Sequence, residues 1–219
     1  MPTEPQPAAP DSSNPRSDNR TENTRRRLLD ATFQRLAREG YASLSLREIG
    51  RDAGINHALI SYHFGSKDEL VIAVLDDLNA RLLDRQKRMY EKPGAFADKW
   101  RQAVRFYDVD LGSGFVRVLI ELYAASLSNP ELRAAFKPRM GAWYDVIRGA
   151  CAEAIATYEL HDVITPEVAG AWICHFWIGM ELSMLAGFND SDIGHRAALQ
   201  AFEALLRRLD ERHSSRARR

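Results

Sequence analysis

The chain has 219 residues, 45 % of them apolar, which is enough for a buried core. Its 30 basic and 30 acidic residues cancel, so net charge alone gives no sign of a polyanionic partner. Two cysteines, Cys151 and Cys174, are too few for the disulfide framework of a small secreted domain. The N-terminus lacks the basic and apolar segments of a signal peptide, and no apolar run approaches 18 residues. We therefore expect a cytoplasmic protein that does not enter a membrane.

The chain is predicted to be helical almost throughout. Residues 1–21 are the expected exception, a disordered tail, because the start of the chain holds five of the nine prolines and almost no large apolar side chain. Apolar periodicity and turn residues predict helices over 22–39, 46–53, 56–63, 67–90, 95–109, 114–127, 130–157, 166–187 and 192–213. Ser45 and Ser66 are the expected N-caps of two of these helices, with Ser45 and Glu48 forming a capping box. The fold class is all-α, with about nine helices.

The most informative segment is 45–64, SLREIGRDAGINHALISYHF, because it has the pattern of a helix-turn-helix. Gly54 permits the positive φ that a sharp turn between two short helices needs. An inward face is predicted for Ile49, Ala53, Ile55, Ile60 and Phe64. Leu59 adjoins Ile60, so one of these two large apolar side chains has to point outward.

The exposed face of the second helix carries side chains that suit a DNA groove. His57 and Ser61 can hydrogen-bond to base edges, and Ala58 and Leu59 can contact thymine methyl groups. Tyr62, His63 and Lys67 can hold phosphates, and Ser45 can do so at a helix N-terminus. On spacing alone, the segment is also compatible with an ordinary three-helix packing unit that has a polar surface.

The distribution of charge favours the hypothesis that this segment binds DNA. Residues 16–67 hold ten basic and six acidic residues, a net charge of +4, whereas residues 68–206 hold 14 basic and 20 acidic residues, a net charge of −6. Positive charge is therefore gathered around the helix-turn-helix. Arg25, Arg26 and Arg27 precede the first apolar residues of the first helix, where they could reach phosphates.

The segment from Glu22 to Leu82 resembles the TetR family of bacterial transcriptional regulators. The resemblance rests on Ile49, Ala53-Gly54-Ile55, Tyr62-His63-Phe64 and Ser66-Lys67-Asp68-Glu69-Leu70. It implies that Ser45 and Arg47 approach DNA from the second helix. It also implies that the bases are contacted by His57, Ala58, Leu59 and Ser61, and that phosphates are held by Tyr62, His63 and Lys67. Many members have Tyr where this chain has Ser61, so base preference cannot be carried over. Leu59-Ile60-Ser61 and the stretch 124–132 are similar to the betaine-synthesis repressor branch.

The resemblance implies a DNA-binding domain over 22–82 and a helical effector-binding and dimerisation domain over 83–213, followed by a basic tail over 214–219. Residues 166–187 are apolar nearly all round, and 195–209 carry a matching apolar stripe. We expect these segments to form a homodimer interface, since a two-fold operator needs two heads; a purely intramolecular core is the alternative.

Aromatic residues with interleaved polar groups predict an effector cavity between the fourth to eighth helices. The candidate lining residues are Phe106, Phe115, Glu121, Tyr123, Trp143, Trp172, His175, Phe176, Trp177 and Glu181. Most of these side chains could equally be core or interface. Aromatic faces beside Glu121 or Glu181 would suit a flat apolar molecule or an organic cation.

No catalytic motif and no metal-ligand spacing is present, so we expect neither an enzyme nor a cofactor nor a metal site. The expected function is that of a sequence-specific repressor that a small-molecule effector releases from operator DNA. The alternative is a helical adaptor or sensor whose basic head binds protein or nonspecific nucleic acid; Leu59 and the block from Tyr62 to Leu70 favour the repressor.

Overall fold

The computed structural model describes the backbone of residues 15–216 and the side chains from residue 19 onward, and within that range the chain forms helices and no strand. The helices are α1 (Pro15–Glu39), α2 (Leu46–Ala53), α3 (His57–Phe64), α4 (Lys67–Glu91), α5 (Phe96–Ser113), α6 (Phe115–Ser128), α7 (Pro130–Tyr158), α8 (Pro166–Leu185), α9 (Asp190–Ile193) and α10 (His195–Arg216). The all-α prediction is confirmed.

The differences from the predicted elements lie at the two ends. Helix α1 begins at Pro15, so residues 15–21 are helical and do not belong to a disordered tail; residues 1–14 and 217–219 lie outside the described part. The single helix predicted over 192–213 is divided at Gly194, whose φ of 60° ends the short helix α9. The described residues therefore form ten helices rather than about nine, and α10 continues into the predicted basic tail.

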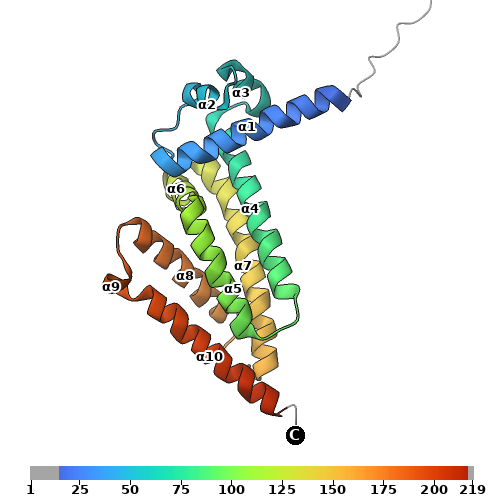
Figure 1. The fold of residues 1–219 in the computed structure, drawn as a ribbon, viewed down its shortest axis with the longest axis vertical. Helices are drawn as coiled ribbons and strands as arrows, with labels where there is room; N and C mark the ends of the chain where they lie inside the picture. Colours follow the sequence, from blue (N-terminus) through green and yellow to red (C-terminus); the bar gives the residue numbers. More distant parts are fainter. Residues whose placement is uncertain (1–14, 217–219) are drawn as a thin grey trace, which may run out of the picture.

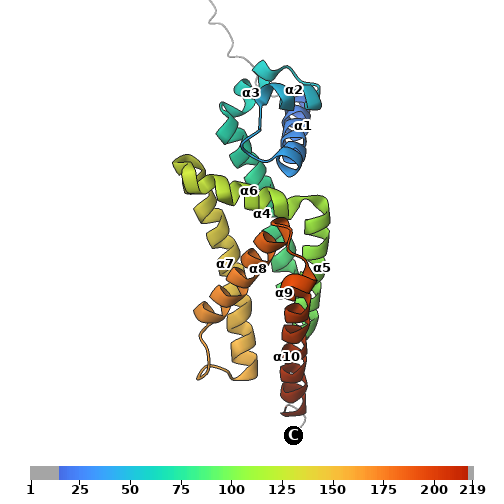
Figure 2. The same cartoon turned by 90° about the vertical axis from the view of Figure 1, so that its left-hand side faces the viewer.

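The molecule is elongated, with a small head at one end of a larger helical body (Figure 1). The head contains α1, α2 and α3, and α4 runs from it into the body. Helix α6 crosses directly beneath the head, whereas α7 runs along the body and packs against α4, α6 and α8 (Figure 2). Helix α10 packs mainly against α5, at the edge of the body away from the head.

Two hydrophobic clusters stabilise this arrangement. The first joins the three helices of the head to α4 and extends to Val118 and Leu122 of α6 and to Phe136 of α7. The second lies in the body, where Trp100, Trp143 and Trp177 pack against aliphatic side chains. Because the first cluster crosses from the head into α6 and α7, a movement of α6 changes the packing beneath the helix-turn-helix.

Helix α8 is long and apolar enough to span a membrane, with 20 residues and a mean hydropathy of 1.3 over its most apolar 18. His175 and Glu181 nevertheless interrupt its apolar residues, and the core helix of a soluble protein can reach the same mean hydropathy. Only 22 % of the residues in that window are buried, and several others are exposed, so part of this apolar surface lies uncovered in the single chain. Its exposed face includes Val168, Trp172, His175, Gly179 and Leu182, which follow one another at helical spacing.

Candidate nucleic-acid interface and ligand cavity

The helix-turn-helix is built around an apolar inner face, as predicted. Ile49 and Ile60 are completely buried and Phe64 nearly so. Gly54 ends α2 in the left-handed conformation, with φ 62° and ψ 36°. Gly50 is also required, because a Cβ at this position would lie 2.7 Å from the backbone oxygen of Ile55. The tight α2–α3 turn therefore depends on two glycines, of which the sequence pattern revealed one.

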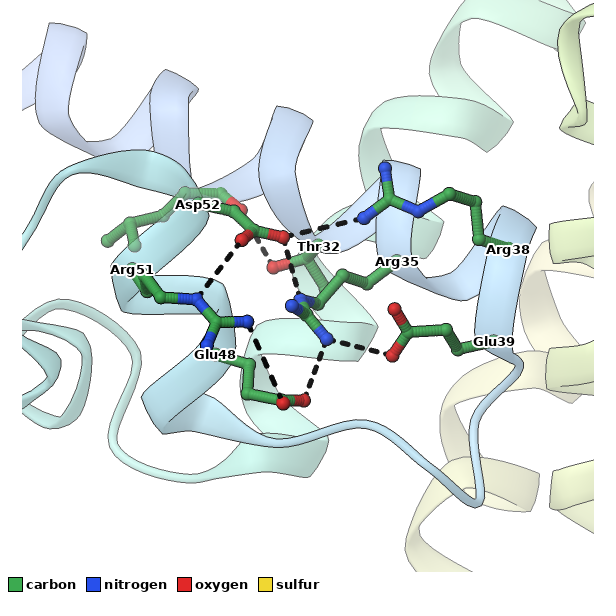
Figure 3. Close-up of polar contacts among 8 residues, drawn as sticks. Thr32, Arg35, Arg38, Glu39, Glu48, Arg51 and Asp52 are labelled. Carbon is green, nitrogen blue, oxygen red and sulfur yellow. Dashed lines mark hydrogen bonds and ion pairs between the residues drawn. The ribbon is translucent and has the colours of Figure 1, made fainter.

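The guanidinium of Arg35 holds α2 against α1 (Figure 3). Its Nε donates to Asp52 at 2.8 Å, and its Nη1 donates to Glu48 at 2.7 Å and to Glu39 at 2.8 Å. The Arg35 side chain is only 5 % exposed, whereas the three carboxylates are 30–40 % exposed. The hydrogen bond to Asp52 raises the pKa of Arg35, and the same bond lowers the pKa of Asp52. A buried cation with three acidic partners thus fixes the position of α2.

Because of this ion-pair network, the start of α2 differs from the prediction. Ser45 occupies the N-cap position with extended backbone, but its side chain makes no capping hydrogen bond. The carboxylate of Glu48 instead faces Arg35, so the predicted Ser45–Glu48 capping box is absent and this prediction is wrong. The hydroxyl of Ser45 is therefore not engaged by α2, at an end of the helix where amide groups favour an anion.

Helix α3 presents one face to solvent, which carries the side chains predicted to contact bases and also Tyr62, which is predicted to hold a phosphate. His57, Ala58, Leu59, Ser61 and Tyr62 are all exposed. Leu59 is 45 % exposed and Tyr62 81 %, although both are large and largely apolar. The side chain of Asn56 accepts a hydrogen bond from the backbone N–H of Ala58 at 3.0 Å and caps the helix. A rigid, capped helix with exposed apolar and polar side chains is suited to a major groove.

The other side chains predicted to contact DNA differ in how exposed they are and in whether they already have a partner within the protein. Arg47 is exposed and has no ion-pair partner among the residues that the structure describes. His63 is half-buried, with its ring 5.3 Å from that of Tyr62. Lys67 donates to the backbone oxygen of Tyr41 at 3.2 Å and lies 4.3 Å from the centre of its ring. The ammonium of Lys67 is thus already anchored inside the protein.

Part of the positive charge counted in the head is likewise used internally. Arg27 donates to the backbone oxygen of Ala53 at 2.5 Å, and Arg26 pairs with Asp30. Arg25 stacks over the ring of Phe64 at 4.6 Å. These arginines stabilise the head as well as raising its potential, so the charge count overstates the number of free phosphate contacts.

Tyr41, in the loop after α1, connects the head to the body. Its backbone N–H donates to the carboxylate of Glu121 in α6 at 3.2 Å, and its hydroxyl donates to Asp68 in α4 at 2.5 Å. Asn129, between α6 and α7, donates to the other oxygen of Asp68 at 2.8 Å. Glu121 therefore lies at the junction of α1 and α6, although the sequence placed it in the effector cavity. Sequence reasoning did not identify Tyr41 at all.

A cavity of about 60 Å³ lies between the fourth to eighth helices, where the sequence predicted it. Five of the predicted lining residues surround it: Phe106, Phe115, Trp143, Trp177 and Glu181. Arg85, Tyr107 and Asp110 also contribute polar groups that the prediction missed. A small number of polar groups among aromatic walls is typical of a site for a small molecule.

The polar groups of this cavity are incompletely paired. Both terminal nitrogens of Arg85 donate to the two carboxylate oxygens of Asp110, while its Nε has no acceptor among the described residues. The hydroxyl of Tyr107, whose residue is 4 % exposed, likewise lacks a partner there. Burial, with a smaller contribution from the charge of Asp110, raises the pKa of Glu181 to about 8. A buried group without a partner is costly unless another molecule satisfies it.

The other predicted lining residues lie elsewhere. Tyr123 is 40 % exposed and stacks on Phe136 with ring centres 5.1 Å apart. His175 is exposed beside Tyr144, and Phe176 packs at the border of the body's core. Trp172 is 68 % exposed and borders a second cavity.

The second cavity, of about 270 Å³, lies between α5, α7, α8 and α10 and is lined almost entirely by apolar side chains. Its one cationic wall residue, Lys99, already donates to the backbone oxygen of Tyr90 at 2.8 Å. Cys151 lines this cavity too, and burial raises the pKa of its thiol to about 11, so it stays protonated. Because nearly all of its described wall is apolar, this space has less to orient a ligand than the first cavity.

Sequence comparison identifies the head. Residues 28–74 match the family described as bacterial regulatory proteins, tetR family. The head therefore contains a domain of the tetR family, and this match does not extend into the rest of the chain. Its curated relatives include the HTH-type transcriptional regulator BetI of Escherichia coli, which is 28 % identical over 112 residues. That match covers 49 % of this chain and 57 % of BetI, so it does not reach across the whole of either protein.

Solved structures show the same fold over most of the chain. The transcriptional regulator FadR from Bacillus subtilis, in complex with stearoyl-CoA, has a TM-score of 0.69 at 18 % identity, covering 83 % of this chain and 96 % of FadR. A transcriptional regulator from Saccharomonospora viridis, in complex with choline, has a TM-score of 0.69 at 20 % identity, covering 83 % and 95 %. This chain therefore shares its fold with regulators whose crystal structures contain very different ligands.

Proposed function

We propose that the protein is a sequence-specific DNA-binding repressor of the bacterial cytoplasm, released from its operator by a small molecule. The observation that carries this proposal is the exposed face of α3, with a 45 % exposed Leu59 beside a completely buried Ile60. Single exposed apolar side chains are common on protein surfaces, but this one lies on the exposed face of a capped helix in a helix-turn-helix, where a thymine methyl group in a major groove would cover it. An adaptor that binds nucleic acid without sequence preference has no need of it.

The test is a comparison of two variants on the same face of α3. Leu59→Ala should weaken binding to the preferred operator by about 1–3 kcal/mol, and less on other sequences, because a base contact is lost. Tyr62→Phe should weaken binding similarly on all sequences and lower the slope of log affinity against log salt by about one unit or less, because its expected partner is a phosphate.

Binding to the DNA upstream of the protein's own gene, and operator selection from random DNA, would measure both effects. The repressor proposal fails if the wild-type protein selects no consensus sequence. The assignment of Leu59 fails if its alanine variant selects the same consensus as the wild type with the same discrimination.

We further propose that two copies of the chain associate through α8 and α10. The exposed stripe on α8 contains Trp172, 68 % exposed, and Leu182, 55 % exposed, and α10 adds Leu205 at 51 %. An uncovered apolar surface of this extent is typical of an oligomer interface. Two heads related by two-fold symmetry can then occupy successive major grooves.

The double variant Trp172→Arg with Leu182→Arg should be a monomer by light scattering at micromolar concentration, because two charges cannot be buried unpaired in an apolar interface. Its affinity for a two-half-site operator should fall at least 100-fold. The matched control is Leu127→Arg, which alters an equally exposed leucine, 69 % exposed, at the end of α6. A double variant that stays dimeric would place the interface elsewhere.

Effector release is supported by the position of α6. Phe115 and Leu119 line the first cavity, and Glu121 on the same helix accepts the hydrogen bond from the backbone of Tyr41 below the head. A ligand that moves α6 therefore acts on the loop that ends α1. Release requires that the ligand bind more tightly to the conformation with wrongly spaced heads. By reciprocity, operator DNA should then weaken ligand binding by the same factor.

A further inference from the structure

The first cavity contains an acid that the protein leaves without a counter-charge. Asp110 is neutralised by its two-fold hydrogen bonding with Arg85, but Glu181, facing them from α8, has no cationic partner among the described residues. If Glu181 is ionised, the cavity carries one net negative charge. If it is protonated, the cavity is neutral and the carboxyl is buried among aromatic side chains.

The walls of the cavity suit a cation. Tyr107, Trp143 and Trp177 contribute aromatic rings to its wall, and ring faces attract cations, most strongly when water is excluded. Arg85 already lies 4.4 Å from the centre of the Phe106 ring, so a cation–aromatic contact of this kind is formed at the cavity wall. The unpaired N–H of Arg85 and hydroxyl of Tyr107 call for a hydrogen-bond acceptor in the same ligand.

We propose that this cavity binds a compact organic monocation that also carries an acceptor oxygen, and that binding drives the proton of Glu181 into solvent. The inference rests on the proposed function, because it names the chemical class of the effector. The positive group would lie against the carboxylate and the aromatic faces, and the oxygen would accept from Arg85 and Tyr107. The proton balance is simple: the neutral carboxyl loses one proton to water and the resulting carboxylate pairs with the ligand.

Glu181 is the group that titrates near neutral pH at this site. Helix α4 contributes Arg85, which is held by Asp110 of α5, and burial raises the pKa of Tyr107 above its ordinary value of 10. Helices α6 and α7 line the cavity only with uncharged side chains in the described part of the chain. Arg196 of α10 faces the ring of Tyr107 and is paired with Asp108.

The consequence is an affinity that rises with pH. Since burial raises the pKa of Glu181 to about 8, the carboxyl is mostly protonated at pH 7, and cation binding should release about 0.9 proton there. Affinity should increase nearly tenfold between pH 6 and pH 7 and level off above pH 8. A neutral ligand does not need the carboxylate and should show no such increase.

The experiment is calorimetric titration of the full-length protein with choline and with its uncharged carbon analogue 3,3-dimethylbutan-1-ol, in buffers of different ionisation enthalpy. We expect choline to bind at least tenfold more tightly than the analogue at pH 8.5, with proton release at pH 7. In Glu181→Gln this preference and the pH dependence should disappear. The matched control Glu167→Gln, an exposed acid in the first turn of α8, should behave as the wild type.

Operator binding in the absence of ligand separates this inference from the proposed function. If wild type and Glu181→Gln bind operator equally but choline is not preferred over the analogue, the cation inference is overturned and the repressor proposal stands. If choline binds as expected but no DNA sequence is selected, the repressor proposal is overturned and the cation inference stands. Preference for choline that survives in Glu181→Gln would also overturn the role of the carboxylate.

Discussion

Arg35→Met should loosen the head and weaken operator binding at least tenfold. Removing one member of a buried ion pair costs about 3–5 kcal/mol when its partner stays buried. Here Glu39, Glu48 and Asp52 are 30–40 % exposed and can regain water, so we expect about 2–3 kcal/mol. The loss should fall on α2, because two of the three carboxylates belong to it.

The matched control is Arg38→Met, because Arg38 is 56 % exposed and reaches only Asp52, at 3.4 Å. Its loss should change stability by less than about 0.5 kcal/mol. Hydrogen exchange of the α2 amides, including that of Ile49, would measure the local effect, and an operator titration the functional one. Equal protection of α2 in the two variants would mean that packing alone positions this helix.

The second large effect is a fall in the stability of the ligand-free protein as the pH rises. The folded state holds the proton of Glu181 more tightly than the unfolded chain, since the pKa rises from 4.5 to about 8 on folding. This contribution is therefore fully present below about pH 4.5 and is lost progressively as the pH rises to about 8. One pKa unit corresponds to about 1.4 kcal/mol, so the total amounts to a few kcal/mol.

Thermal unfolding of wild type and Glu181→Gln between pH 5 and pH 9 would isolate this contribution, because every other titrating group is common to both proteins. The wild-type midpoint should fall relative to that of the variant as the pH rises, and the two curves should run parallel above about pH 8. Glu167→Gln serves again as the control for the substitution itself. Parallel curves over the whole range would show that the carboxyl of Glu181 is well solvated.

Local patterns predicted the helices well, because each depends on residues close together in the sequence. The spacing of Ile49, Ala53 and Ile60 placed the helix-turn-helix, and Gly54 placed its turn, as the structure confirms. Glu48 shows where such reasoning stops. Its distance from Ser45 fits a capping box, yet Arg35 on another helix offers it a full positive charge.

The cavity was predicted less completely for the same reason. Aromatic composition identified the helices that surround it, but not which way each side chain points. Glu121 and Glu181 are both acids within apolar helices, and they are equivalent on that criterion. Glu121 contacts the loop after α1, whereas Glu181 lines the cavity. This difference depends on how α6 and α8 are rotated in the assembled body.

Asp210, near the end of α10, caps the start of α5, which lies 114 residues earlier in the sequence. Ala95 gives α5 no side-chain cap, and the carboxylate of Asp210 instead accepts from the backbone N–H groups of Phe96, at 3.2 Å, and Ala97, at 3.0 Å. It also accepts from the hydroxyl of Tyr158 at the end of α7, at 2.7 Å. During synthesis the start of α5 is made 114 residues before Asp210, so its first turn lacks this cap until that part of α10 has also been made. Two helices thus depend on a residue that is made much later: a chain that stops before Asp210 leaves the start of α5 and the Tyr158 hydroxyl at the end of α7 without this carboxylate.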